Sequence, residues 1–115
     1  MTDVSAETSD ELVRAKINSE TARIPWKELQ RFFASGKTLL VNSELDLVEV
    51  GFSFHEDQAE RVALWLEQER IRVVSNEVAK HWVENNAEVW AVVVKPWVLI
   101  QDTEVSAGYE PTKLK

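Results

Sequence analysis

The stretch VWAVVVKPWVLIQ, Val89–Gln101, decides the fold, because nine of its residues are Val, Ile, Leu or Trp around a single Lys-Pro step. Read as one extended strand, it has two apolar rows, formed by Val89, Ala91, Val93, Trp97 and Leu99 and by Trp90, Val92, Val94, Val98 and Ile100. A strand with one wet face alternates apolar and polar residues, so we predict that this strand is covered on both sides. Pro96 cannot donate a ladder hydrogen bond, and we expect a bend or bulge there, with the proline nitrogen at a sheet edge.

The material that covers this strand has two possible sources. The helices of one chain can flank both faces of a small sheet. Alternatively, a second copy of the chain completes the burial, and symmetric dimers are the commonest soluble oligomers. The sequence favours the homodimer, because we expect the three apolar helix stripes of the chain to coat one face and only part of the other.

Composition indicates a single globular domain. The chain has 115 residues, 44% of them hydrophobic, with only three Gly and three Pro. The absence of Cys excludes disulfides, thiolate nucleophiles and Cys-based zinc sites, and it fits a reducing compartment. The start MTDVSAETSDE is acidic where a secretory leader is basic, and no apolar run approaches the ~20 residues of a membrane-spanning helix. We therefore expect a cytoplasmic protein.

The net charge of −7 argues against two classes of partner. The Lys and Arg residues are scattered through the chain and form no basic stripe. Such a stripe is what attracts a phosphate backbone or an anionic membrane surface. We expect neither nucleic acid nor membrane as a direct partner.

Hydrophobic spacing predicts one α+β domain over residues 9–101, with flexible tails at 1–8 and 102–115. Its sheet is mixed or antiparallel, has three to four strands, and packs with about four helices. The expected helices are Ser9–Asn18, Pro25–Gly36, Glu56–Glu69, and a helix from a Ser75 cap to a break at Asn85. Four strands are expected. Lys37–Val41 and Leu45–Phe54 form a hairpin, and the run IRVV (Ile71–Val74) and the stretch Val89–Gln101 follow. The third helix collects Ala59, Val62, Ala63 and Leu66 on one apolar face.

Two short motifs have structural interpretations that outweigh the chemical ones. SGKT at Ser35–Thr38 is similar to the end of a phosphate-binding loop, but the earlier glycine of that motif falls at Arg31 and the order is helix to strand. Gly36 is therefore interpreted as a helix C-cap. HED at His55–Asp57 could begin a metal or general-base site, but acids are typical of a helix first turn. We expect no metal, no cofactor and no catalytic residues.

The polar pair Glu49 and Lys95 is the first candidate for a site. Each interrupts an apolar row of a predicted strand, so the two side chains would face one another if these strands are neighbours. Such an ion pair is either structural or part of a pocket with perturbed titration.

Tryptophan supplies the other candidates, because its large apolar body and polar N–H suit interfaces as well as cores. The chain has five, at positions 26, 65, 82, 90 and 97. By parity Trp90 and Trp97 point to opposite sides of the sheet if no bulge intervenes, whereas a bulge at Pro96 would place them on the same side. The Trp that stays nearest the surface is the expected interface anchor. Binding candidates are therefore Glu49, Lys95, Trp97, Trp26 and the off-face Leu64.

Three blocks carry a resemblance to a known family: TARIPWKEL (Thr21–Leu29), LDLVEV (Leu45–Val50) and VWAVVVKPWVLIQ (Val89–Gln101). Over about Leu12–Gln101 the chain resembles a family of short bacterial proteins known only as a domain of unknown function. The resemblance implies no activity and no catalytic residues. It implies that the family pattern includes Pro25, Trp26, Asp46, Glu49, Pro96 and Trp97.

The function expected from the sequence is a non-enzymatic protein-interaction module that acts as a homodimer. The two-sided strand, the off-face Leu64 and the missing catalytic set favour this hypothesis. A small-ligand-binding or enzymatic domain, with a pocket near Glu49 and Lys95, is the alternative.

Overall fold

The computed structural model describes residues 4–103, with side chains from residue 9 onward. Its elements in chain order are α1 (Val4–Glu20), β1 (Ala22–Pro25), the 3₁₀ helix η1 (Trp26–Leu29), α2 (Gln30–Ala34), β2 (Thr38–Val41), α3 (Leu47–His55), α4 (Ala59–Glu67), β3 (Ile71–Val73), α5 (Asn76–Glu84), β4 (Glu88–Val94) and β5 (Trp97–Asp102). The α+β prediction is confirmed, with more elements than expected: five strands form one mixed sheet, in the order β1-β4-β5-β2-β3. The predicted tails reach beyond the described residues, so the domain limits of 9–101 stay a prediction.

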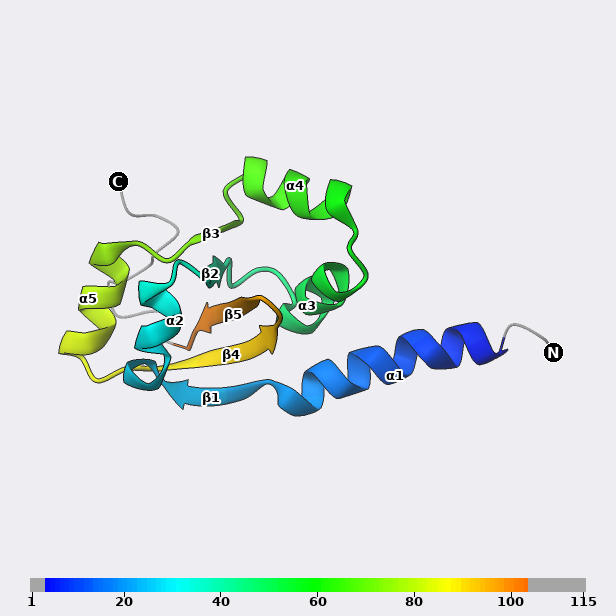
Figure 1. Cartoon of the computed structure of the whole chain (residues 1–115), viewed down its shortest axis with the longest axis horizontal. Coiled ribbons are helices and arrows are strands. Elements are labelled where there is room, and N and C mark those ends of the chain that lie inside the picture. Colours follow the sequence, from blue (N-terminus) through cyan, green and yellow to red (C-terminus); the bar gives the residue numbers. More distant parts are fainter. Residues whose placement is uncertain (1–3, 104–115) are drawn as a thin grey trace.

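The stretch Val89–Gln101 forms the centre of the sheet, as two strands (Figure 1). β4 and β5 are an antiparallel hairpin joined by a turn at Lys95 and Pro96, whose peptide bond is cis. β5 also pairs with β2 in parallel, while β1 and β3 form the two edges. The predicted single bent strand with a proline at a sheet edge is therefore wrong, because the chain reverses at the proline.

This reversal changes which residues share a face of the sheet. Val92 and Val94 face the same side as Leu99, together with α1, α3 and Trp65 of α4; we call this side the α3 face. Val89 and Ala91 face the other side, the α5 face, with Val98, Ile100, η1 and α5. The two rows predicted for a single strand are therefore wrong after Pro96: Leu99 lies with Val92 and Val94, and Val98 lies with Val89 and Ala91. Trp90 and Trp97 do share a side, since Trp90 alternates with Val92 and Val94 pairs with Trp97.

One chain covers both faces of the central hairpin. Val98, Leu99 and Ile100 are at most 1% exposed, which confirms the predicted exclusion of water from both sides for β5. For β4 the prediction holds only in part, because Trp90 and Val93, on opposite faces, are 40% and 48% exposed. Helices from this same chain provide the cover on each face. The burial of β5 therefore does not depend on a second copy, because helices of one chain flank both faces, as in the alternative prediction.

The region around Pro25 differs from the predicted helix start. Pro25 is the last residue of the edge strand β1, where its missing N–H costs no ladder bond. Trp26 then begins η1, and α2 follows it. Gly36 ends this helical segment with a φ of 74°, as expected for a C-cap glycine.

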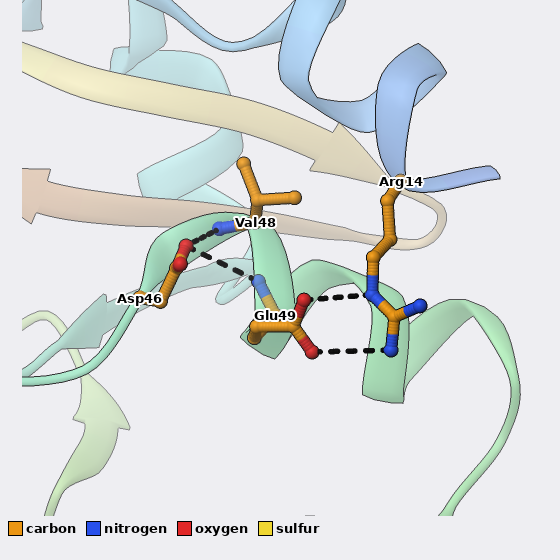
Figure 2. A network of polar contacts seen from close by, with 4 residues as sticks. All are labelled: Arg14, Asp46, Val48 and Glu49. Carbon is orange, nitrogen blue, oxygen red and sulfur yellow. Dashed lines mark hydrogen bonds and ion pairs between the residues drawn. The ribbon is translucent and has the colours of Figure 1, made fainter. Parts of the chain in front are cut away.

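The segment Leu45–Phe54 is the main error of the sequence prediction, because it contains helix α3 and no strand. Asp46 is the N-cap: its side chain accepts hydrogen bonds from the backbone N–H groups of Val48 and Glu49 (Figure 2). An N-cap acid followed three residues later by Glu is the sequence signature of a capping box. Here this local signal overrides the apparent alternation of apolar residues.

Helices α4 and α5 both lie where the sequence predicts them, but their apolar faces behave differently. In α5, Ser75 caps the helix through a bond from the Val78 N–H, and Val78, Ala79 and Trp82 are buried as expected. In α4, only Trp65 is buried. The predicted apolar face of α4 therefore does not cover the sheet.

Candidate functional site

The structure separates the binding residues that the sequence suggested. Trp26 is a core residue, 1% exposed, with its ring centroid 4.9 Å from that of Trp82. Leu64 is half exposed on the outer side of α4. Lys95 and Trp97 lie together at the β4–β5 turn. Glu49 lies on α3 and does not form the predicted pair with Lys95, because the strand on which that pair depended is a helix.

Glu49 instead joins two helices. Arg14 of α1 donates from Nε to Glu49 Oε2 at 2.7 Å and from Nη2 to Oε1 at 3.4 Å (Figure 2). The guanidinium carbon of Arg14 also lies 4.0 Å from the centre of the Phe52 ring. The hydrogen bond to Glu49 raises the pKa of Arg14. This cluster seats α1 on α3, which is a structural role.

The first hollow, which we call the α4 groove, lies between α4 and the β4–β5 turn and has a volume of about 340 Å³. Its apolar lining includes Phe54, Val62, Ala63, Leu66, Pro96 and Trp97. Asp57, Gln58 and Lys95 add polar groups at its margin. A lining of this kind, mainly apolar with few polar groups, is typical of binding sites.

The second hollow lies between α1, the end of α3 and the end of β4, with a volume of about 560 Å³. Lys16 and Glu20 of α1 line it beside apolar Val13, and Lys95 lines it from the turn. Lys95 thus borders both hollows, and Glu49 borders neither. The alternative pocket predicted from Glu49 and Lys95 together is therefore not formed by that pair.

Titratable groups do not assemble into a reactive site in the part of the chain that the structure describes. Within residues 4–103 no three His, Asp or Glu side chains come together as metal ligands would. Nδ1 of His55 lies 3.1 Å from Oε2 of its neighbour Glu56. His81 lies one turn from Asn85 in α5, with Nδ1 3.3 Å from the Asn85 Nδ2.

The model of a family described as "Protein of unknown function (DUF2288)" matches residues 12–102. The chain belongs to this family. It is 43% identical to the protein PA1075 from Pseudomonas aeruginosa, whose solution structure was solved by NMR, with a TM-score of 0.72 over 86% of this chain and 92% of that one. No curated protein matches the chain.

The residues that carry the family resemblance occupy structural positions. Trp26 is in the core, Asp46 caps α3, Glu49 binds Arg14, and Pro96 forms the hairpin turn. Trp97, half-buried beside Pro96, is the exception, since it also lines the α4 groove. Among the described helices none has the length and apolar character of a membrane span.

Trp90 is the surface residue that the sequence-based candidates do not include. It is 40% exposed, whereas Trp26, Trp65 and Trp82 are at most 8% exposed. The rule that the most exposed Trp is the interface anchor would have found it, but parity alone does not say which part of a face the helices leave open. That information is tertiary.

Proposed function

We propose that this protein is a non-enzymatic, cytoplasmic protein-interaction module that acts as a homodimer, with Trp90 at the centre of its self-association surface. The observation that carries the proposal is the exposure of Trp90, 40%, because it is the most exposed aromatic side chain on the sheet, although Val93 and Val73 of the sheet are exposed as well. Trp and Arg are among the residues most enriched in interface hot spots. Arg23 lies beside Trp90, as its partner in the β1–β4 ladder.

The cover on the α3 face is uneven, which explains the exposure of Trp90. α1 and α3 meet near the hairpin turn, where a Cβ on Gly51 would lie 3.1 Å from Ile17 Cγ2 and 3.6 Å from Val94 Cγ2. Trp90 is at the other end of β4, opposite Gln101. At this end of the sheet the cover is a loop and not a helix. Gln101 Nε2 donates hydrogen bonds to the backbone carbonyls of Asn42 and Leu45 in that loop.

The surface around Trp90 suits a two-fold contact through the sheet face. β1 is an edge strand, and an uncovered edge is a place where another chain can pair. Pro25 and the ion pair of Arg23 with Glu88, at 3.4 Å, make this edge a poor template for strand addition. We therefore place the contact on the Trp90 side chain, and in a two-fold dimer each copy supplies the same patch.

The test is the mass in solution of two matched variants, measured by light scattering at micromolar concentration. Trp90→Thr and Val93→Thr each replace an exposed apolar residue of β4 with a β-branched polar one, but the two side chains point to opposite faces. We expect the native protein and Val93→Thr to have twice the chain mass of 13.2 kDa, and Trp90→Thr to have the chain mass. A native protein that remains monomeric, or a Trp90→Thr variant that remains dimeric, would contradict the proposal.

A further inference from the structure

Helix α4 has an apolar face that the described residues of the chain leave open. Trp65 is the one buried residue of the helix. Leu66, on the face predicted to be apolar, is 45% exposed, and Ala59 and Ala63 beside it are exposed as well. Figure 1 shows α4 standing away from the sheet, above α3 and β3, and these are the elements against which it chiefly packs. An amphipathic helix normally buries such a face, so this one is available to a partner.

The open face of α4 is one wall of the α4 groove. The opposite wall is the β4–β5 turn, with Pro96 and the half-buried Trp97. The Lys37 ammonium lies 5.7 Å from the centre of the Trp97 ring. The groove therefore has a helical wall, a turn as its second wall, and Phe54 among its apolar lining.

Charge is distributed unequally across this groove. At about 100° per residue, Glu60 and Glu67 lie side by side on α4, roughly 90° around the helix from the centre of the open face. Trp65 lies about as far around on the other side and points to the core. Helix geometry therefore places the two glutamates, which are not part of the lining itself, at the outer lip of the groove. Asp57, which lines the groove, adds a third carboxylate, and Lys95 on the turn side is the only basic residue among the described residues of the lining.

We propose that the α4 groove binds a basic amphipathic helix of another protein, with the apolar stripe of that helix on Val62, Leu66 and Trp97. The charges set its orientation: the cationic flank of the partner lies along Glu60 and Glu67, and its uncharged flank lies toward Lys95. α4 is nine residues long, which matches two to three turns of such a helix. This inference rests on the proposed role as an interaction module, but its surface is separate from that of Trp90.

The experiment uses three synthetic, dye-labelled peptides and measures their binding to the full chain by fluorescence anisotropy. The first peptide has Leu at i, i+3, i+4 and i+7, with Lys along one flank and Gln elsewhere. The second has Glu in place of Lys, and the third has Ser in place of Leu. We expect the first peptide to bind, the second to bind with an affinity at least about tenfold lower, and the third not to bind. Equal binding of the Lys and Glu peptides would overturn the proposal.

Matched variants of the chain show whether the peptide uses this groove. Leu66→Ser and Leu64→Ser change the same residue type in the same helix at similar exposure, 45% and 50%, but only Leu66 lines the groove. Leu66→Ser should abolish binding of the Lys peptide, and Leu64→Ser should leave it unchanged. Equal loss in both variants would contradict the assignment. Circular dichroism and thermal unfolding verify that each variant is folded.

A second pair of variants separates local from general electrostatic attraction, because the whole chain has a net charge of −7. Glu60→Gln with Glu67→Gln removes the acidic lip. Glu28→Gln with Glu84→Gln removes the same charge from η1 and α5, which cover the other face of the sheet. We expect only the first pair to weaken binding, by about tenfold. Equal weakening by both pairs would mean nonspecific attraction and would overturn the proposal.

Two other occupants of the groove are outcomes of the same experiments. If Leu66→Ser converts a dimer to a monomer, a second copy fills the groove and the proposal is wrong. If deletion of residues 104–115 raises peptide affinity and shifts the NMR signals of Val62 and Leu66, the chain's own C-terminal segment fills it, and the proposal is again wrong. Peptide binding that persists in Trp90→Thr separates the two surfaces, because either proposal can then fail without the other.

Discussion

Gly51 is the residue on which the seating of α1 depends. It lies in the middle of α3, where a glycine lowers helix stability by about 1 kcal/mol relative to alanine. Its value is the space that it leaves: a Cβ there would be 3.1 Å from Cγ2 of Ile17, which is 5% exposed. A Cβ at this position would therefore crowd the contact of α1 with α3, and Ile17 would have to shift by a few tenths of an ångström to make room.

The substitution Gly51→Ala should destabilise the protein in spite of the better helix propensity of alanine. Crowding in a packed core costs about 1–3 kcal/mol, which offsets the gain of about 1 kcal/mol. In an Ile17→Ala background the obstruction is gone, so the same substitution should become stabilising by about 1 kcal/mol. Urea unfolding of the four proteins gives both values. Stabilisation in the native background would show that Ile17 yields freely and would contradict this account.

At the scale of elements, two helix starts show what a local signal can and cannot reveal. Ser75 is recognisable as a cap because polar residues follow it before the apolar face begins. Asp46 is harder to recognise, because Leu45, Leu47 and Val50 also fit a strand with partial alternation. The acid at Asp46 and the Glu three residues later favour a helix, and Gly51 has no strand role to explain it. A short apolar run alone does not decide between the two structures.

The cap at Asp46 should carry a measurable part of the stability of α3. Asp46→Ala leaves the backbone N–H groups of Val48 and Glu49 without their partner and should lower the free energy of unfolding by about 1 kcal/mol. Asp46→Asn retains an acceptor oxygen and should cost less than half as much. Chemical denaturation measures both variants. Equal losses for Ala and Asn would mean that the charge at the helix N-terminus, and not the hydrogen bond, is what stabilises α3.

At the scale of the whole molecule, burial is concentrated in the central hairpin and falls off toward α4. β5 has a hydrogen-bonded strand on each side and helices on both faces, whereas α4 is attached chiefly through Trp65. Elements with few buried contacts open locally at lower free energy than the core. The molecule thus combines a rigid sheet with a weakly attached helix that forms one wall of the α4 groove.

Hydrogen exchange should reproduce this gradient. The amides of Val98 to Ile100 should exchange only on global unfolding, and those of α4 should exchange through local opening, with a free energy several kcal/mol lower. NMR-detected exchange at increasing denaturant concentration distinguishes the two, because local opening depends little on denaturant. Protection of α4 equal to that of β5 would show that the helix is held by more than Trp65.

The sequence by itself determined the α+β class, the two-sided burial of the central stretch, the cap and face of α5, and the left-handed backbone at Gly36. Each of these features follows from residues that are close together in the sequence, through hydrophobic periodicity, a capping residue or a glycine. Only the tertiary structure decided that Pro96 is a turn between two strands, that Glu49 binds Arg14, that Trp90 lies beyond the cover of α1 and α3, and that the apolar face of α4 stays open. These features depend on how segments that are far apart in the sequence are arranged in space, and local sequence patterns do not determine that arrangement.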